Sequence, residues 1–310
     1  MRSLPAFFAA LSVVSFTSVS AQESDGGAAV QFLDQLTSDS DWTLTESVAL
    51  KFNAHHPQGM TRIGDSFYLT AVETTVRPER VSTPGSVYDR TAGAGTGHLF
   101  KFDLQGNLQA AITLGEGSIY HPGGMDYDGK HLWIPVAEYR PDSHAIVYRV
   151  EPASLAVDEV FRFDDHLGGL LRNPEDGTVY GLSWGSRKLY RWSEVNGSYD
   201  PTRTESKIKL GSDVDYQDCQ LLSARAMLCS GMGSLPIDNT HVLTIGGLEL
   251  VDLDSLEVTH KIRVTGTAPG GELLTRNPFW FELNENQRGA FYFVPEDEQA
   301  TLYHYSTAQP

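Results

Sequence analysis

Apolar and polar residues alternate along this chain in short runs, without the longer period of an amphipathic helix. Runs of branched and aromatic residues, such as 98–102 and 145–150, recur between turns rich in glycine and aspartate. Runs of this length and composition are typical of β-strands. The Asp-Gly steps at 128–129 and 176–177 favour hairpins, because glycine accepts the backbone angles of a tight turn. The pattern predicts an all-β chain with one short helix at residues 31–36.

Two stretches of the chain are near-copies of each other. The motif His-Pro-x-Gly-Met begins at His56 and again at His121, and each copy is followed by an apolar run and a glutamate. His56 and Glu73 are 17 positions apart, and so are His121 and Glu138. A fainter third copy begins at His166. Internal repeats of this length are typical of propellers, solenoids and arrays.

The repeats predict the blades of a propeller. Two further apolar runs follow each of the first hairpins, and four strands make one blade. Two weaker units in the C-terminal half bring the total to five blades, or six if residues 230–246 contain further strands. The run at 42–45 is expected to close the ring beside the last blade. We therefore predict a single β-propeller domain over residues 41–310, preceded by an N-terminal segment at 22–40.

The N-terminus has the pattern of a secretory signal peptide. Arg2 supplies the basic end, an apolar run follows, and a small-residue cleavage site ends at Ala21. We expect residues 1–21 to be removed and the protein to pass through the secretory pathway to the extracellular space. No other segment approaches the ~20 apolar residues of a membrane-spanning helix, so no membrane span is expected.

Two further features fit that compartment. Cys219 and Cys229 are the two cysteines of the chain, and they fall on the two strands of one predicted hairpin. In a secreted protein a disulfide between them is the default, with two buried free thiols as the alternative. Asn196 begins an Asn-Gly-Ser acceptor for N-glycosylation on a predicted loop.

The charge of the chain narrows its partners. The formal net charge is −17, from 40 acidic and 23 basic residues. Nucleic acids and anionic membranes bind clustered lysine and arginine, so neither is expected as a partner. The acidic residues are dispersed, which is typical of a solubilising surface. We expect a monomer whose partner is a small molecule of apolar or aromatic character.

The repeated histidines and glutamates are the candidate functional residues. The first strand of a propeller blade lines the central channel, so His56, His121 and His166 should meet at one mouth of it. A hairpin returns its second strand to the edge where the first strand began. This geometry should bring Glu73 to His56 and Glu138 to His121. Concave polar sites of this kind are where ligands bind.

Three interpretations of this cluster stay open. In the first, the cluster is structural and its rings bond the neighbouring backbone. In the second, His56, His121 and His166 bind a divalent metal, with the glutamates behind them. In the third, His–Glu pairs transfer protons without a cofactor, because a carboxylate fixes the imidazole tautomer and shifts its pKa. Under the third interpretation, which we take as the working hypothesis, the catalytic residues are His56, Glu73, His121, Glu138 and His166.

Further residues are expected around the mouth. Residues 74–97 form an insertion that should arch over the mouth as a lid, or else lie free as a surface loop. Arg77 and Arg140 each closely follow one of the glutamates; they are suited to clamp an anionic oxygen, or to form salt bridges with those glutamates. The aromatic residues expected to wall an apolar pocket, unless they belong to the core, are Trp184, Tyr216 and Trp280.

A family resemblance adds to this reading. The signal peptide, the single propeller domain and the His-Pro-x-Gly-Met repeats resemble a group of secreted-type propeller proteins of unknown function. That group is similar in shape to gluconolactonase- and strictosidine-synthase-like propellers. More narrowly, the chain looks like the fungal hetero-Diels–Alderases of tropolone–sesquiterpene biosynthesis. The resemblance covers nearly the whole mature chain.

The resemblance implies an enzyme of secondary metabolism that needs no cofactor. Such an enzyme dehydrates a hydroxymethyl tropolone-type precursor to a quinone methide and directs its cycloaddition onto a sesquiterpene alkene. Dehydration needs an acid and a base, and cycloaddition needs a dry pocket that orients two partners. One alternative is a lyase, lactonase or hydrolase that acts on a sugar-like substrate with a divalent metal at the mouth. The other is a ligand-binding propeller without enzymatic activity.

Overall fold

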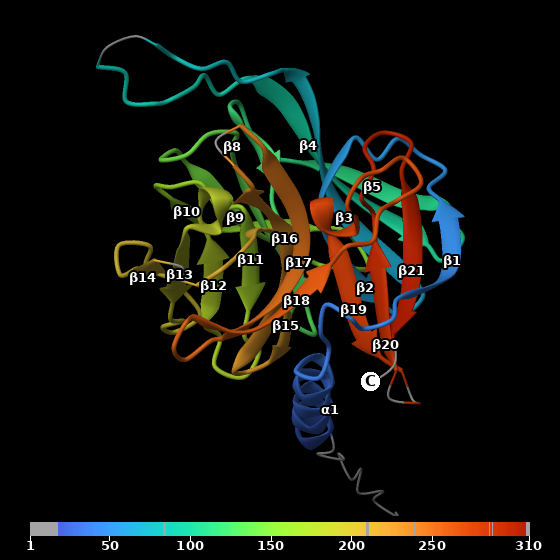
Figure 1. Ribbon diagram of the computed structural model, residues 1–310. Helices are drawn as coiled ribbons and strands as arrows, with labels where there is room; N and C mark the ends of the chain where they lie inside the picture. The colour runs from blue at the N-terminus through green and yellow to red at the C-terminus, as the bar shows by residue number, and fades with distance from the viewer. Residues whose placement is uncertain are drawn as a thin grey trace, which may run out of the picture.

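Five antiparallel sheets stand around a central axis as the blades of a propeller (Figure 1). The computed structural model describes residues 18–82, 85–208, 211–238, 240–284, 286 and 288–307. In the first four blades the strands follow one another in chain order, from the inner strand outward. The predicted five-bladed, all-β propeller is confirmed.

The strands of each blade have the following bounds. Blade 1 contains β2 (His56–Ile63), β3 (Ser66–Val76), β4 (Ala94–Asp103) and β5 (Leu108–Leu114). Blade 2 contains β6 (Ile119–Pro122), β7 (Asp126–Tyr127), β8 (Leu132–Glu138), β9 (Ala145–Val150) and β10 (Val157–Phe163). Blade 3 contains β11 (Gly169–Arg172), β12 (Val179–Leu182), β13 (Lys188–Trp192) and β14 (Glu205–Ile208). Blade 4 contains β15 (Asp215–Ser223), β16 (Ala226–Pro236), β17 (Val242–Asp252) and β18 (Glu257–Val264). Blade 5 contains β19 (Phe279–Leu283), β20 (Gly289–Phe293), β21 (Thr301–Thr307) and β1 (Thr43–Ala49). The 3-10 helices lie between strands: η1 (Trp184–Ser186) between β12 and β13, and η2 (Leu274–Arg276) between β18 and β19.

The two ends of the domain are joined in one sheet. β1 pairs antiparallel with β21, and Ser47 lies opposite Tyr303. The predicted closure of the ring by the run at 42–45 is therefore confirmed. Residues 230–238 and 240–246 belong to the distal part of the hairpin of β16 and β17, which extends blade 4 and adds no sixth sheet to the described residues.

The helix differs from the prediction in its bounds. Helix α1 (Ser18–Leu33) begins well before residues 31–36, and the last of those residues lie in a turn. The apolar residues at 31–36 mark the part of this segment that is buried, and they do not mark the length of the helix. Phe32, Leu33 and Leu36 pack into the core between blades 4 and 5. The upstream residues have no apolar period to mark a helix. Residues 1–17 of the predicted signal peptide lie outside the described residues.

The glycines of the repeated motif allow the inner strands to approach one another closely. A Cβ atom added at Gly59 would lie 2.5 Å from the backbone nitrogen of Met125 in the next blade. One added at Gly123 would lie 2.5 Å from the carbonyl oxygen of Gly168 in blade 3. Gly124 also donates its N–H to that carbonyl over 2.9 Å. The glycines of the motif thus let the inner strands of blades 1, 2 and 3 pack closely at the axis.

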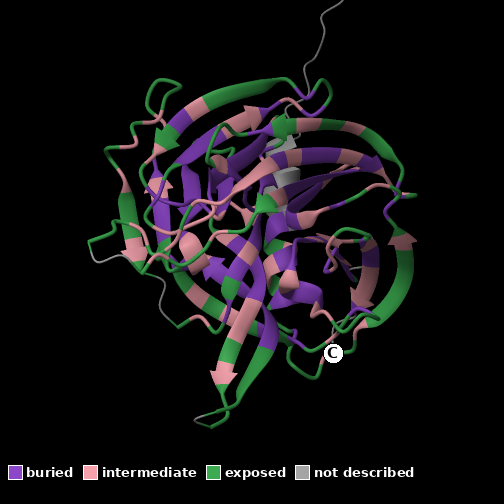
Figure 2. Ribbon diagram, turned by 90° about the horizontal axis from the view of Figure 1, so that it is seen from above, coloured by how far each residue is buried: buried purple, intermediate pink, exposed green. Residues whose placement is uncertain are grey.

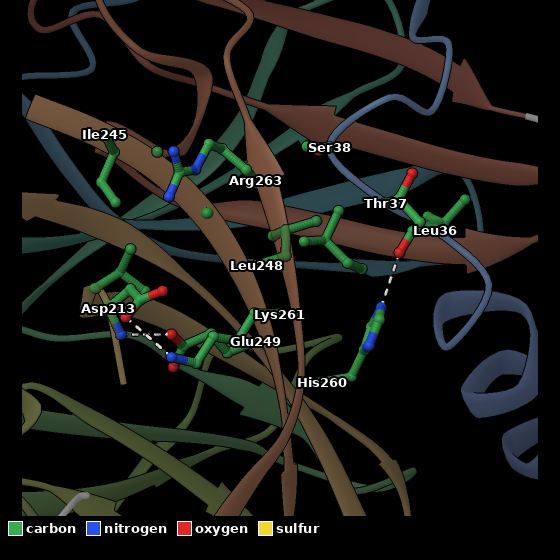
Figure 3. Close-up of a pocket in the computed structure, with 14 residues that line it drawn as sticks. Leu36, Thr37, Ser38, Asp213, Ile245, Leu248, Glu249, His260, Lys261 and Arg263 are labelled. Atoms are coloured by element: carbon green, nitrogen blue, oxygen red, sulfur yellow. Dashed lines mark hydrogen bonds and ion pairs between the residues drawn. The ribbon is translucent and has the colours of Figure 1, made fainter. Parts of the chain in front are cut away.

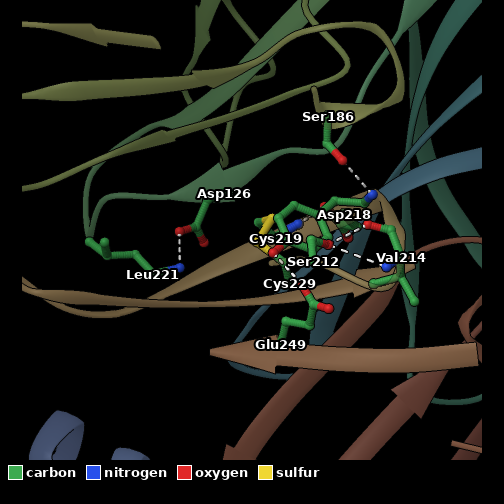
Figure 4. Close-up of a disulfide and its surroundings, with 10 residues drawn as sticks. Asp126, Ser186, Ser212, Val214, Asp218, Cys219, Leu221, Cys229 and Glu249 are labelled. Atoms are coloured by element: carbon green, nitrogen blue, oxygen red, sulfur yellow. Dashed lines mark hydrogen bonds between the residues drawn. A yellow bond between two sulfur atoms is a disulfide. The ribbon is translucent and has the colours of Figure 1, made fainter. Parts of the chain in front are cut away.

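Buried carboxylates connect blades across the channel. Asp218 of β15 accepts a hydrogen bond from the backbone N–H of Met60 in blade 1 over 2.9 Å. Asp126 of β7 accepts one from the N–H of Leu221 in blade 4 over 2.7 Å (Figure 4). Both carboxylates are almost fully buried. These two bonds join blade 4 to blades 1 and 2 at the axis.

The predicted disulfide is confirmed. Cys219 and Cys229 lie directly opposite each other on β15 and β16, with a Cα–Cα distance of 4.1 Å, and their sulfur atoms are bonded (Figure 4). This is within the range that a disulfide spans. The bond lies inside blade 4 and fixes the inner hairpin.

Burial follows the radius of the ring. Seen from above, the buried segments run through the inner parts of the sheets, and the outermost strands are largely exposed (Figure 2). The described helices include none with the length and apolar character needed to cross a membrane.

Candidate functional site

The structure brings His56, His121 and His166 to one cavity of about 240 Å³. We call it the mouth cavity; Tyr139, Trp184 and Tyr216 also line it. His56 opens β2, His121 lies on β6, and His166 precedes β11, so each comes from the innermost strand region of a different blade. The ring centres of His121 and His166 are 6.1 Å apart.

His121 is the most unusual of the three. Its side chain is buried, with 6% of its surface exposed, and neither ring nitrogen has a hydrogen-bond partner among the described residues. Its ring packs against that of Tyr139, with a centroid distance of 4.1 Å. Burial, with further contributions from His166 and His56, lowers its pKa well below the usual value, so the ring is neutral. A buried polar group without a partner is costly, which points to a ligand or water at this place.

His166 is held in a defined tautomer. Its Nδ1 lies 2.8 Å from the backbone carbonyl oxygen of Glu138. A carbonyl oxygen only accepts, so Nδ1 carries the hydrogen and Nε2 carries the lone pair. Burial lowers the pKa of His166 to about 4, which keeps the ring neutral. The edge of this ring meets Trp184 at 4.8 Å between centroids.

His56 forms a pair with a carboxylate that sequence reasoning missed. Its Nδ1 lies 2.7 Å from Oδ1 of Asp297, which follows β20 in blade 5. Arg276 donates to the other oxygen of Asp297 over 2.7 Å. Burial alone would raise the pKa of Asp297, but the bonds from His56 and Arg276 outweigh it and lower the pKa. The ionised carboxylate therefore fixes Nδ1–H of His56 and leaves Nε2 for a ligand.

The predicted pairing of each histidine with the glutamate of its own hairpin is wrong. His56 lies opposite Val72 on β3, and Glu73 points to the other face of the sheet. A β-bulge at Gln58 shifts the register of β2 against β3 by one residue. Without the bulge, the register of the pair Gly59 and Thr70 would continue and would place His56 opposite Glu73. A one-residue shift moves a side chain to the opposite face.

The second blade repeats this arrangement. His121 lies opposite Ala137, because the register also changes by one residue between β6 and β7. Glu138 instead accepts hydrogen bonds from Ser118 and from Nε of Arg140, the latter over 2.7 Å. Burial raises the pKa of Glu138, but these two bonds dominate together and lower it. Among the described residues, the bond between Glu138 and a mouth histidine is the one from His166 to its backbone carbonyl.

Arg140 and Trp280 do not line the mouth cavity. Arg140 is engaged by Glu138, and its guanidinium lies 3.5 Å from the ring centre of Tyr88. Of the two roles expected for Arg140, a clamp on an anionic oxygen or a salt bridge to Glu138, the structure shows the salt bridge. Trp280 packs against the core between blades 1 and 5. Tyr216 does line the cavity, and its hydroxyl donates to Glu249 over 2.5 Å.

A second cavity, of about 400 Å³, adjoins the first. We call it the arginine cavity, because Arg77, Arg90 and Arg276 line it. His56 and Tyr139 line both cavities, so the two are neighbours. Arg77 has no ion-pair partner among the described residues, and its charge is free to meet an anion.

The insertion between β3 and β4 reaches across the mouth. It projects from the end of blade 1 above the neighbouring blades (Figure 1). Arg80 and Arg90 form a bridge that makes its base a short hairpin. The guanidinium of Arg90 lies 4.8 Å from the ring centre of Trp184 in blade 3. Tyr120 donates its hydroxyl to the carbonyl of Ala92 over 2.7 Å. The insertion thus contacts blades 2 and 3 at the rim.

A third cavity shares no lining residue with these two. It has a volume of about 370 Å³ and lies between β17, β18 and residues 36–38 (Figure 3). His260 donates from Nε2 to the carbonyl of Leu36 over 2.8 Å, and Lys261 pairs with Asp213 over 2.9 Å. The bond from His260 attaches the N-terminal segment to blade 4, and the pair of Lys261 and Asp213 lies within blade 4, so we assign the cavity a structural role.

The side chains best arranged to hold a metal lie beside the mouth. Ligand atoms of His55, Glu73 and His98 all fall within 4.8 Å of one another. Among the described residues no such group includes His56, His121 and His166 together.

Comparison with solved structures identifies the fold alone. A mannose phosphorylase from Leishmania mexicana is 11% identical, with a TM-score of 0.50 over 86% of this chain and 89% of that one. A glucose dehydrogenase is 10% identical, with a TM-score of 0.45 over 84% and 99%. The WD40 domain of Pan2 from Neurospora crassa is also 10% identical, with a TM-score of 0.41 over 89% and 98%. Such low identities carry no function from one chain to another.

The comparison with curated proteins found no match. A family model, however, covers residues 23–309, which include the whole propeller and the N-terminal segment. The chain therefore belongs to DUF6454, a family of unknown function.

Proposed function

We propose that the protein is an enzyme that transfers protons to and from a small aromatic molecule bound in the mouth cavity. The observation that carries the proposal is His121, a buried imidazole that lines the cavity without a partner for either nitrogen. It is flanked by two further histidines whose Nδ1 atoms are already engaged. Neutral imidazoles with a free nitrogen are suited to general acid–base catalysis near neutral pH.

The histidines have different roles in this proposal. The pair of His56 and Asp297 acts as the acid, because the carboxylate stabilises the imidazolium form of His56. His121 acts as the base, since its low pKa keeps it unprotonated. His166, fixed by the carbonyl of Glu138, orients the substrate through Nε2.

The walls of the two cavities favour an aromatic substrate with an acidic oxygen. The rings of Tyr139 and Trp184 lie 5.7 Å apart at the mouth and can stack on an aromatic ring. Arg77, which has no ion-pair partner among the described residues, brings positive charge to the adjoining cavity of a strongly acidic protein. Such a pair of features suits an enolate or phenolate-like group.

The specific reaction that we propose is dehydration followed by cycloaddition. His56 donates a proton to the hydroxymethyl oxygen of a tropolone-type precursor, and His121 accepts the proton of the ring hydroxyl. The carbon–oxygen bond breaks, water leaves, and a quinone methide remains in the cavity. A sesquiterpene alkene then adds to it by a hetero-Diels–Alder reaction that forms one carbon–carbon and one carbon–oxygen bond. The protein contributes orientation and exclusion of water to this second step.

The test is replacement of His121 by asparagine. Turnover of a hydroxymethyl tropolone with a sesquiterpene alkene should fall about 10²-fold, the usual scale for a general acid or base. The exposed His241, which pairs with Asp238, supplies the control, and His241→Asn should leave turnover unchanged. Circular dichroism checks that both variants fold.

Two results would contradict the proposal. Equal turnover in wild type and His121→Asn would remove His121 from the chemistry. Binding of the tropolone by the wild type without any turnover would instead support a ligand-binding propeller.

A further inference from the structure

A second histidine cluster lies beside the arginine cavity, which His55 lines, where blade 1 meets blade 5. The ligand atoms of His55, Glu73 and His98 lie within 4.8 Å of one another. Nε2 of His98 is 3.3 Å from Oε2 of Glu73, and the rings of His55 and His98 stack at 4.9 Å with an angle of 11° between their planes. All three residues are partly exposed, so an ion in solution can reach them.

The backbone places these three side chains together. His98 on β4 lies opposite Ala71 on β3, two residues before Glu73, so Glu73 and His98 are diagonal neighbours on one face. His55 has a φ of +50°, a left-handed conformation that is uncommon for a residue other than glycine. Its carbonyl accepts from the N–H of Glu298 over 2.6 Å, which fixes this conformation. A strained residue held in this way is often functional.

The donor set is that of a transition-metal site. Two imidazole nitrogens and one carboxylate oxygen bind zinc and non-haem iron, with further positions left for water. Ligands bound at about 2.1 Å are separated by roughly 3–3.5 Å, which the contact of His98 with Glu73 already matches.

Glu298 completes the arrangement. One of its oxygens lies 4.0 Å from Nδ1 of His55. A metal-bound imidazole commonly donates its second N–H to a carboxylate, which fixes the ring and raises its basicity. Glu298 is near enough to His55 to take this role once the ring coordinates an ion.

We infer that His55, Glu73 and His98 form a binding site for a divalent transition metal of the Zn²⁺ type, with Glu298 orienting His55. The ligands come from the turn before β2, from β3 and from β4. Glu73 and His98 stand on either side of the insertion that reaches across the mouth. A bound ion would therefore tie the base of that insertion to the turn that immediately precedes His56. This inference goes beyond the proposed function, since binding needs no turnover.

The test is calorimetric titration of the full protein, freed of metal by chelator dialysis, with Zn²⁺ and separately with Mg²⁺. We expect one Zn²⁺ per chain and no comparable binding of Mg²⁺, because imidazole ligands disfavour the harder ion. Glu73→Gln and His98→Gln should each weaken Zn²⁺ binding at least tenfold, and Glu298→Gln should weaken it by about tenfold. His241→Gln removes a histidine that pairs with a carboxylate elsewhere and should have no effect.

Three results would overturn the inference. The first is no stoichiometric binding by the wild type. The second is unchanged affinity in both Glu73→Gln and His98→Gln, which would indicate adventitious binding at the surface. The third is loss of binding in His121→Gln alone, which would move the metal to the mouth cavity. Because the readout is affinity, an inactive enzyme that binds Zn²⁺ would refute the proposed function and leave this site intact.

Discussion

At the scale of single residues, the channel holds buried ionisable groups whose effects on stability oppose each other. Burial raises the pKa of Asp126 to about 7, although bonds from the N–H groups of Leu221 and Tyr127 work against it and nearby Asp128 adds to it. Burial lowers the pKa of His166 to about 4. Asp126 therefore binds its proton more tightly in the folded chain, and His166 less tightly, than in the unfolded chain. The contribution of Asp126 to stability is lost as pH rises from about 4 to 7. The contribution of His166 is lost as pH falls from about 6.5 to 4.

Single variants should separate these two effects. We expect the stability advantage of wild type over Asp126→Asn to shrink as pH rises from 4 to 7.5. The advantage over His166→Gln should shrink in the opposite direction, as pH falls from 6.5 to 4. Each tenfold change in proton affinity is worth about 1.4 kcal/mol. Urea unfolding at several pH values measures both, and parallel curves for wild type and Asp126→Asn would show that Asp126 titrates normally.

Asp297 gives a second prediction at this scale. Asparagine at position 297 can still accept the hydrogen of His56 but cannot stabilise its positive charge. Turnover of the tropolone substrate should therefore fall about 10²-fold or more, with little change in KM. Asp164→Asn is the matched control, because Asp164 pairs with the exposed His144 away from the cavities. Steady-state kinetics decide the matter, and an equal effect of both variants would deny Asp297 a positioning role.

At the scale of strands and blades, the close approach of the inner strands is the feature most sensitive to change. A Cβ at Gly59 would meet three backbone atoms of blade 2 at 2.5 to 2.9 Å, so Gly59→Ala forces the blades apart. We expect a loss of roughly 1–3 kcal/mol in the free energy of unfolding. Gly27 in α1 has open space around it, and Gly27→Ala should gain roughly 0.5–1 kcal/mol. Thermal unfolding of both variants tests this. If Gly59→Ala changed the stability as little as Gly27→Ala does, the inner strands would be able to move apart at little cost.

The same scale explains what could be read from the sequence. Strand runs, turns and the repeated motif predicted five blades, the ring closure and the disulfide, because these depend on local alternation and on spacing. The partners of the mouth histidines could not be predicted, since one bulge at Gln58 reverses which face a side chain occupies. Asp297 lies 241 residues from His56 and reaches it from the adjacent blade. Glu73 lies within the second strand of its blade and Glu138 ends its own, whereas Asp297 lies beyond the end of β20, so the spacing of the repeat did not point to it.

At the scale of the whole molecule, the ring holds its shape because its ends meet in blade 5. β1 supplies the outer strand of that sheet, and Phe32 and Leu33 of α1 pack into the core between blades 4 and 5. Without these segments β21 becomes an exposed edge strand, which readily pairs with other chains.

We therefore expect a chain that begins at residue 51 to unfold at a lower temperature and to aggregate. A peptide of residues 22–50, added in excess, should restore the monomer by adding a strand to the open edge of β21. A peptide of the same composition in scrambled order should not, because it lacks the pattern that places Val48 opposite Leu302. Light scattering and thermal unfolding follow both effects. If the shortened chain stayed monomeric and equally stable, contacts between the inner strands alone would be sufficient to close the ring.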